Sequence, residues 1–202
     1  MKGILLLNGE PYSDAIDAEG AVVYCCDGAY EWAKDRVRID KNVGDFDSLG
    51  YIPFPPPEEV YPAEKNFTDG EIALFKMLKA GVDEIYIYGG GGGREDHFLG
   101  NLQLLYAALK HGARAKMITD RSVMFAARGR VELSDIPGST FSLLPFGERV
   151  HIMDSGGCKY AYPECISLGE CRGISNVALS RHAFVQLGRG ETALVIINRG
   201  KV

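Results

Sequence analysis

Short apolar runs alternate with helix-like stretches over residues 1 to about 128, and this alternation most strongly limits how the chain can fold. The runs have the length of buried strands, and several of them end at Gly, Asp or Thr. Strands alternating with helices predict an open, mostly parallel sheet with helices on both faces, an α/β fold. The expected strands are 4–7, 21–26, 43–46, 60–61, 84–88 and 113–118.

Two stretches between these strands carry a helical apolar stripe. The first follows Thr68, which is expected to form a capping box with Glu71. The second follows Gly93, where apolar residues recur at i, i+3, i+4 and i+7. The stripes consist of Leu74, Phe75, Leu78 and Val82, and of Leu102, Leu105, Tyr106 and Leu109.

The pattern changes after Gly129. Strand-like runs at 140–146, 149–153, 183–187 and 193–197 are separated by Gly, Pro and Ser, and no stretch of ten residues shows a helical stripe. We therefore expect two domains, an α/β domain at 1–128 and a small all-β domain at 129–202. A β domain of this size is marginally stable alone, so we expect it to pack on the first domain or on a second copy.

Charge and cysteine content exclude several classes of partner. The chain has 22 basic and 27 acidic side chains and a net charge of -5, which gives no electrostatic footprint for nucleic acid or an anionic membrane. The apolar run at 4–7 is too short for a signal peptide or a membrane span. Five cysteines without a Cys-x-x-Cys pair predict reduced thiols in a cytoplasmic protein.

Asp45 and Asp47 are the first candidate metal ligands. In an extended segment, two carboxylates one residue apart project to the same side. Such an anionic, oxygen-only pair suits Mg²⁺, which binds carboxylates, phosphate oxygens and water. The stretch Gly-Asp-Phe-Asp-Ser is also good turn chemistry, so the residues alone leave both interpretations open.

More acidic residues follow the other expected strands. Ligands of open parallel sheets bind beyond the carboxyl ends of the strands. Asp27 follows the second strand, Asp69 opens a helix after the fourth, and Asp120 follows the sixth with Thr119 before it. We expect these residues to gather at one rim of the sheet.

Five consecutive glycines follow the fifth strand and lead into a helix. Their unobstructed backbone amides, together with a helix N-terminus, predict an anion site for phosphate. The loop does not end in Gly-Lys-Ser/Thr and does not fit Gly-x-Gly-x-x-Gly, which disfavours the usual NTPase and dinucleotide motifs. The glycines are Gly89, Gly90, Gly91, Gly92 and Gly93.

The residues after the glycines extend this prediction. Arg94 supplies a fixed cationic fork that a phosphate accepts bidentately. Asp96 is an N-cap of the helix or a functional carboxylate, and the residues alone favour the cap. His97 is expected to support the site without contacting the ligand.

These motifs together closely resemble the thiamin pyrophosphokinase family, especially its bacterial forms. The resemblance covers nearly the whole chain, and five motifs in order make it highly specific. The matching segments are 26–29 (Cys-Asp-Gly-Ala), 43–48 (Val-Gly-Asp-Phe-Asp-Ser), 62–69 (Pro-Ala-Glu-Lys-Asn-Phe-Thr-Asp), 89–97 (five Gly, then Arg-Glu-Asp-His) and 173–176 (Gly-Ile-Ser-Asn).

The resemblance implies a nucleotide-binding catalytic domain followed by a thiamin-binding β-sandwich, in a homodimer with thiamin held between subunits. It implies transfer of a pyrophosphoryl group from ATP to the hydroxyl of thiamin, releasing AMP, with Mg²⁺. By motif, Asp45, Asp47 and Asp69 match the metal and catalytic cluster, and the glycines with Arg94 match the phosphate loop. Asp96 matches a catalytic carboxylate. The family's substrate-binding positions match Asp27, Lys65, Ser175 and Asn176. The segment near the adenine matches Thr119 and Asp120.

The chain departs from the family pattern at three places. Asn66 stands where the family has Asp, which removes a charge beside the metal cluster. Tyr30 and Glu31 replace the more usual small residue and Asn. The single tryptophan is Trp32, so no indole of the β domain can stack on the thiamin pyrimidine, and Tyr160 or Phe184 is left for that role.

Two other functions remain open on the sequence. One keeps the same machinery and moves the pyrophosphate to another small heterocyclic alcohol. The other is a nucleotide sensor without turnover, for which the departure at Asn66 is the argument.

Overall fold

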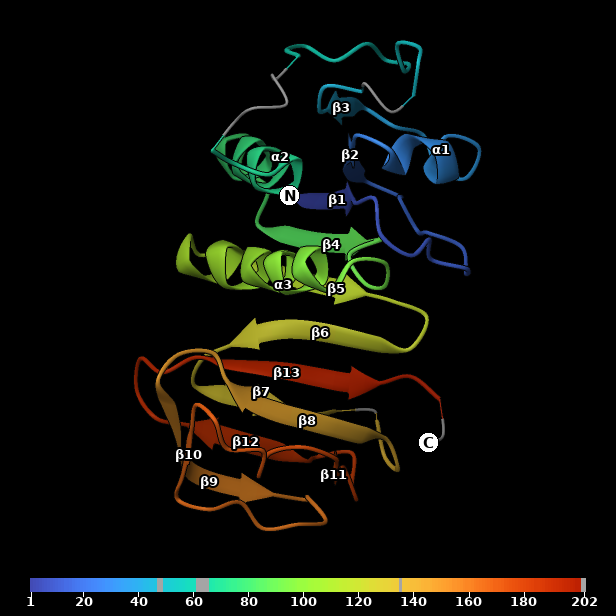
Figure 1. Cartoon of the computed structure of the whole chain (residues 1–202). Helices are drawn as coiled ribbons and strands as arrows, with labels where there is room; N and C mark the ends of the chain where they lie inside the picture. The colour runs from blue at the N-terminus through green and yellow to red at the C-terminus, as the bar shows by residue number, and fades with distance from the viewer. Residues whose placement is uncertain (47–48, 61–65, 135, 201–202) are drawn as a thin grey trace. The chain divides into compact units, whose positions relative to one another are not determined.

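The computed structural model describes residues 1–46, 49–60, 66–134 and 136–200 (Figure 1). The chain forms two compact units, Met1–Asp120 and Arg121–Val202. The division falls earlier than the boundary expected from the sequence, because β6, Ser122–Ala127, pairs with β13, Ala193–Asn198, inside the second unit.

The first unit contains a parallel sheet in the order β5-β4-β1-β2-β3 (Figure 1). Strand β1 is central, with β2 on one side and β4 on the other, so the chain reverses its direction of travel across the sheet between these neighbours. The strands are β1 Lys2–Leu6, β2 Ala21–Cys26, β3 Lys41–Val43, β4 Glu84–Tyr88 and β5 Arg114–Ile118.

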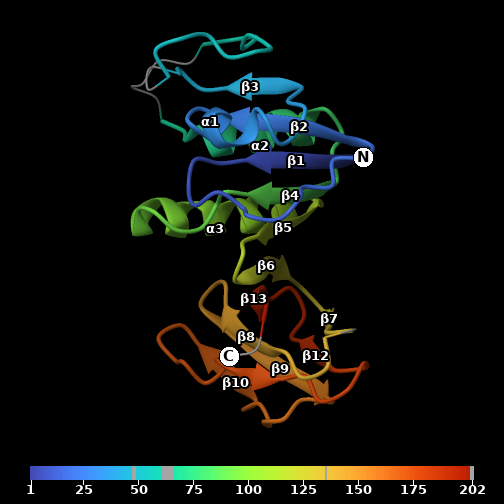
Figure 2. The same cartoon turned by 90° about the vertical axis from the view of Figure 1, so that its right-hand side faces the viewer.

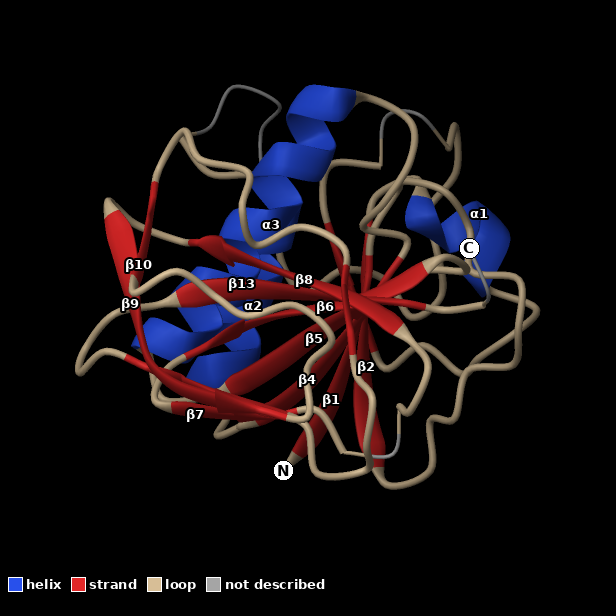
Figure 3. Ribbon diagram, turned by 90° about the horizontal axis from the view of Figure 1, so that it is seen from below, coloured by secondary structure: helices blue, strands red, loops and turns tan. Residues whose placement is uncertain are grey.

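Helices cover both faces of this sheet, as the alternating sequence predicted (Figure 3). Helix α1, Ala29–Ala33, packs on the face of β1 that carries Ile4 and Leu6. Helices α2, Asp69–Lys79, and α3, Glu95–Lys110, lie on the opposite face, where a Cβ at Gly3 would meet the Met77 side chain at 2.4 Å.

The start of α2 confirms the predicted capping box. Glu71 N–H donates to Thr68 Oγ1 at 3.2 Å, and Thr68 N–H donates to Glu71 Oε2 at 2.9 Å. Two of the orphan amides at the helix start are thereby satisfied, which places Asp69 in the first turn with a fixed orientation of the backbone.

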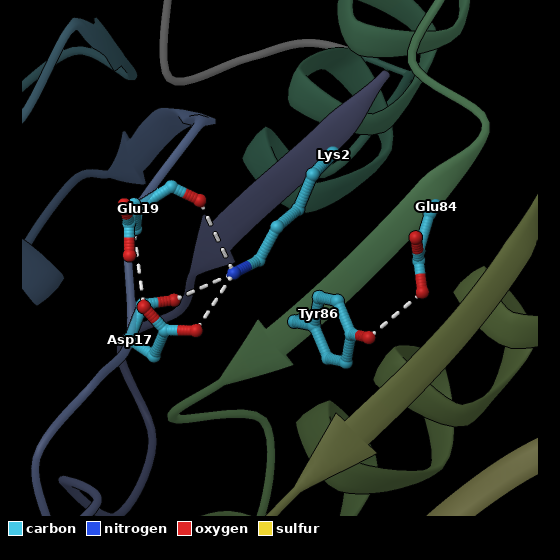
Figure 4. A network of polar contacts seen from close by, with 5 residues as sticks. All are labelled: Lys2, Asp17, Glu19, Glu84 and Tyr86. Atoms are coloured by element: carbon cyan, nitrogen blue, oxygen red, sulfur yellow. Dashed lines mark hydrogen bonds and ion pairs between the residues drawn. The ribbon is translucent and has the colours of Figure 1, made fainter.

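A polar network holds the segment before β2 to the sheet (Figure 4). Lys2 Nζ donates to the carbonyl oxygen and to Oδ2 of Asp17, both at 3.1 Å, and to the Glu19 carbonyl oxygen at 3.4 Å. On the neighbouring strand, the Tyr86 hydroxyl donates to Glu84 at 2.8 Å. The connection between β1 and β2 is therefore anchored at its far end.

The second unit consists of two antiparallel sheets that enclose one core (Figure 2). Their orders are β11-β8-β13-β6 and β10-β9-β12-β7. Alternate residues of both sheets, such as Phe141, Val150 and Val185, are fully buried, which confirms the expected β-sandwich. The remaining strands are β7 Arg130–Glu132, β8 Thr140–Pro145, β9 Arg149–Gly156, β10 Cys165–Ser167, β11 Asn176–Val177 and β12 Phe184–Leu187.

The prediction of a strand at 43–46 is wrong. Strand β3 ends at Val43, and Phe46 takes a left-handed φ of +57°, which a β-strand does not allow. The argument that an extended backbone projects Asp45 and Asp47 to one side therefore fails. Val60 makes a single parallel bridge with Gly44, while Tyr61 of the expected strand at 60–61 lies outside the described residues.

The longest helix, α3, has 16 residues. Among the helices of the described ranges, none combines the length and apolar character that crossing a membrane requires.

Candidate active site

The reversal of strand order at β1 and β4 creates the point where open α/β sheets bind ligands. Two loops leave the carboxyl ends of these strands, the β1 loop at residues 8–14 and the glycine loop at residues 89–93. Gly9 N–H donates to the Gly89 carbonyl oxygen at 2.7 Å, and Glu10 N–H donates to that of Gly91 at 2.6 Å. The two loops therefore form one continuous wall.

A cavity of about 700 Å³ lies beside this wall within the first unit. It brings together residues from three segments that the sequence analysis had selected separately. Its acidic residues come from after β2, from the start of α2 and from the start of α3. The predicted residues in its wall are Asp27, Asp69, Gly92, Arg94, Asp96 and His97.

Asp45 lies close to this cavity but does not line it. The amide of Asp27 donates to the Val43 carbonyl oxygen at 3.0 Å, and a Cβ at Gly44 would lie 3.2 Å from the Asp27 Cβ. The backbone before Asp45 is thus packed directly on Asp27. Asp47, the other half of the predicted pair, lies outside the described residues, as does Lys65.

Left-handed backbone marks the same motifs. Among the described residues, three that are not glycine have a positive φ: Asp27 at +42°, Phe46 at +57° and Ser175 at +61°. This conformation is costly for a residue with a Cβ and is concentrated at functional sites. Each of the three falls in a segment that the sequence analysis selected for its chemistry.

The glycine loop uses its carbonyl oxygens to hold its shape. Gly89 and Gly91 accept bonds from the β1 loop, and Gly90 accepts one from Asn101 Nδ2 at 3.0 Å. Of the hydrogen bonds found among the described residues, none uses an N–H of residues 90–93. The carbonyl oxygens of the loop are used in hydrogen bonds within the protein, while its N–H groups remain available as donors. Such a loop is suited to bind an anion.

Side chains cannot be added at Gly89 or Gly92 of this loop. A Cβ at Gly89 would lie 2.1 Å from the Leu7 carbonyl oxygen, and one at Gly92 would lie 2.6 Å from the Glu10 Cβ. Gly92 also has a φ of +67°. Close approach of neighbouring chains, and not flexibility, therefore requires glycine here.

Arg94 and Asp96 bind each other at the mouth of the loop. Arg94 Nε and Nη2 donate to Asp96 Oδ1 and Oδ2 at 3.1 and 2.6 Å. The Arg94 guanidinium lowers the pKa of Asp96 to about 2, although the pair is exposed. The N-cap of α3 is Arg94, so the interpretation of Asp96 as the cap is wrong.

Carboxylates of this rim supply the oxygen ligands that Mg²⁺ prefers. Asp27 and Asp69 share the cavity, and Asp45 follows the strand next to Asp27. Within the described residues, however, there is no group of three His, Cys, Asp or Glu side chains close enough to hold a metal. The predicted ligand set also includes Asp47, which lies outside them.

Thr119 and Asp120 lie at the end of β5, on the glycine-loop side. A Cβ at Gly91 would lie 2.9 Å from Thr119 Cγ2, so Thr119 packs against the loop. Asp120 Oδ1 accepts a bond from Ser13 N–H at 2.9 Å, which ties it to the β1 loop.

Ser175 and Asn176 belong to the second unit. Asn176 is buried, its Nδ2 donates to the Tyr160 carbonyl oxygen at 2.8 Å, and its Oδ1 accepts from Tyr160 N–H at 3.0 Å. Asn176 therefore supports Tyr160, whose side chain is 53% exposed. The ring of Phe184 is covered by the Arg130 guanidinium at 3.5 Å.

Sequence reasoning missed several residues of the cavity wall. Asn8 and Gly9 follow β1, and Asn101 comes directly before the apolar stripe of α3. Phe67 is 56% exposed beside Asp69. The Asn-Gly pair directly after a central strand was the available signal for the β1 loop, and the polar residue next to the helix stripe was the one for Asn101.

The fold and this site define an open α/β protein with an acidic, glycine-lined ligand cavity at its topological switch point. The family model for the catalytic domain of thiamin pyrophosphokinase matches residues 15–117. A curated relative named thiamine pyrophosphokinase, from Bacillus subtilis, is 33% identical over 161 residues, which is 75% of each chain. The chain therefore belongs to the thiamin pyrophosphokinase family, which is a family of enzymes.

Solved structures agree with this assignment. The crystal structure of thiamine pyrophosphokinase from Bacillus subtilis has a TM-score of 0.80 and 28% identity, and covers 100% of this chain and 99% of that one. Thiamin pyrophosphokinase from Geobacillus thermodenitrificans has a TM-score of 0.80 with 24% identity, covering 100% and 98%. At that identity, the second comparison supports the fold alone.

Proposed function

We propose that the chain transfers the pyrophosphoryl group of ATP to the hydroxyl of thiamin, giving thiamin diphosphate and AMP. The observation that carries the proposal is the cavity at the switch point, where the glycine loop and Arg94 meet the carboxylates of Asp27, Asp69 and Asp96. Phosphoryl transfer requires positioning and charge neutralisation more than covalent chemistry, and this wall supplies both. The family and the name of the curated relative support the same reaction.

The glycine loop and Arg94 bind the phosphates of ATP in this proposal. The hydrogen bonds between the β1 loop and the glycine loop use only carbonyl oxygens of the glycine loop, which leaves its N–H groups for phosphate, and the guanidinium matches a phosphate bidentately. Thr119 and Asp120, which contact the glycine loop and the β1 loop, lie toward the adenine.

Asp45, Asp47 and Asp69 would hold Mg²⁺. When bound, the ion neutralises charge that develops on the phosphate oxygens. The oxygen-only donor set fits this hard cation, and Asn66 adds no charge to it.

Proton transfer falls to Asp96 or Asp69. The thiamin hydroxyl attacks the β-phosphorus in line, the bond to the α-phosphate oxygen breaks, and the hydroxyl proton passes to a carboxylate. With its pKa held at about 2 by Arg94, Asp96 is a weak base. It becomes a better one when Arg94 moves onto phosphate, so ATP binding would activate Asp96.

Thiamin is a cation, and an acidic cavity attracts it. We assign Asp27 and Lys65 to its binding, together with Ser175 and Asn176 of the second unit. Asn176 acts by holding Tyr160, whose exposed ring is suited to stack on the pyrimidine.

A homodimer completes the proposal. Large apolar side chains are exposed on the second unit, where Met153 is 69% and Leu168 74% exposed, and a second copy would cover them. All five cysteines are free thiols, which fits a cytoplasmic enzyme.

Incubation with Mg-ATP and thiamin, followed by measurement of AMP and thiamin diphosphate, tests the reaction. Equal amounts of both products support the proposal. Turnover with another hydroxyalkyl heterocycle but not with thiamin would show that the acceptor is a different alcohol. Nucleotide binding without either product would favour a sensor. Light scattering after gel filtration measures the oligomeric state.

A further inference from the structure

We propose that Arg36 is a positioning residue for ATP: by binding three successive carbonyl oxygens of the β1 loop, it holds that loop against the glycine loop. Arg36 follows α1 and lies outside the cavity wall. The inference rests on the proposed role of the glycine loop in binding ATP.

The hydrogen bonds described for the Arg36 guanidinium all go to backbone carbonyl oxygens. Nη1 donates to the Tyr12 carbonyl oxygen, and Nη2 donates to those of Ser13 and Asp14 at 3.0 and 2.7 Å. A planar guanidinium presents its donors in a fixed fork, so three consecutive carbonyls that converge on it fix the conformation of the loop. Arg38, two residues further on, instead pairs with Asp40 at 3.5 Å, and its side chain is 91% exposed.

The loop that Arg36 fixes supports the glycine loop directly. Its first part donates two hydrogen bonds to the glycine loop, from Gly9 and Glu10. Its middle is tied by Ser13 N–H to Asp120, and the buried Tyr12 ring packs 5.0 Å from that of Tyr88, the residue before the glycines. Movement of the β1 loop therefore moves the groups that orient the glycine amides.

Trp32 joins the same structure from α1. Its Nε1 donates to the Leu7 carbonyl oxygen at 3.2 Å. Its ring also borders the glycine loop, because a Cβ added at Gly89 would lie 2.9 Å from the Trp32 Cζ2 atom. The Arg36 guanidinium lies 5.9 Å from the ring centroid, within cation–π range. Since Trp32 is the single tryptophan of the chain, its fluorescence reports on this junction.

A preorganised loop binds its ligand more tightly, because no ordering cost is incurred on binding. Removing Arg36 leaves the glycine residues in place but frees the β1 loop. The loss should therefore appear in the affinity for ATP and not in the chemical step or in the affinity for thiamin.

Steady-state kinetics of Arg36→Gln tests this. We expect the KM for ATP to rise about tenfold, as for the loss of a hydrogen-bonding charged group, with kcat and the KM for thiamin nearly unchanged. Arg38→Gln is the matched control and should behave as the wild type. A purely structural role would lower the melting temperature without raising the KM for ATP, and that result would overturn the inference. If Arg36→Gln does not fold, Arg36→Lys replaces it, and a wild-type KM there overturns the inference equally.

Titration with ATP, followed through Trp32 fluorescence, separates this inference from the proposed reaction. We expect a saturable change in the wild type and in Arg38→Gln, and an apparent Kd about tenfold weaker in Arg36→Gln. Equal Kd values in all three proteins, or no ATP binding at all, would overturn the role of Arg36. If the wild type binds ATP but forms no thiamin diphosphate, and Arg36→Gln binds ATP more weakly, the role of Arg36 stands and the proposed reaction is rejected.

Discussion

Arg94 and Asp96 form a bidentate ion pair across one intervening residue, with Nε–Oδ1 and Nη2–Oδ2 distances of 3.1 and 2.6 Å. Arg94, which we assign to phosphate binding, is thus paired with Asp96, which is one of the two carboxylates proposed to accept the proton. In the proposed reaction, phosphate and Asp96 would compete for one guanidinium, which would link the binding of ATP to the basicity of Asp96.

Replacing Arg94 with Lys should separate these two effects. Lysine keeps the charge but cannot bind Asp96 or phosphate bidentately, so the pKa of Asp96 should rise toward its ordinary value and the KM for ATP should rise about tenfold. NMR titration of the Asp96 carboxyl and initial rates at varied ATP measure the two quantities. Arg189→Lys, at an exposed turn of the second unit, is the control. An unchanged Asp96 pKa would contradict the pairing.

Asp45→Asn should lower kcat by about 10²- to 10³-fold while leaving the melting temperature close to that of the wild type. The amide keeps the size of the side chain and removes the charge that would hold Mg²⁺. Rates at saturating Mg-ATP and thiamin check the first part, and thermal unfolding checks the second. Asp35→Asn, an exposed carboxylate after α1, should retain full turnover. Retained turnover in Asp45→Asn would remove this residue from the metal site.

Gly92→Ala should both destabilise the protein and weaken ATP binding. The new Cβ would lie 2.6 Å from that of Glu10, at a φ of +67°, and the left-handed conformation alone costs about 1 kcal/mol. Urea unfolding and the KM for ATP measure the two effects. Gly129→Ala has the same strain, with a φ of +69°, but no atom within 4 Å of the added Cβ, so it should lose stability and keep a normal KM.

Glu191 should make the free energy of unfolding of the protein depend on pH in the acidic range. The hydrogen bond from His151 N–H, at 2.6 Å, lowers the pKa of Glu191, so its contribution is present above the ordinary glutamate pKa and is lost as pH falls through the lowered value. Glu191→Gln should reduce the free energy of unfolding by about 1 kcal/mol at pH 7 and by less at pH 3. Urea unfolding at both values checks this. Glu148→Gln, whose side chain is 84% exposed, should show no such difference.

Local sequence was sufficient for the elements that carry strong patterns. The Thr68–Glu71 capping box and the apolar stripes predicted α2 and α3, and four strand-like runs predicted β8, β9, β12 and β13. Helix α1 and the strands β6, β7, β10 and β11 were missed. Strands β7, β10 and β11 have only two or three residues, which are too few to show a period.

The candidate site was predictable as a set of motifs but not as a shape. Glycine runs and recurring aspartates state which chemistry is possible, since amides and carboxylates are fixed by residue type. Only the tertiary structure shows that Phe46 breaks the extended segment between Asp45 and Asp47, and that the β1 loop forms half of the wall. Backbone hydrogen bonds between loops distant in the chain leave no mark in residue type, and neither does the grip of Arg36 on three carbonyl oxygens.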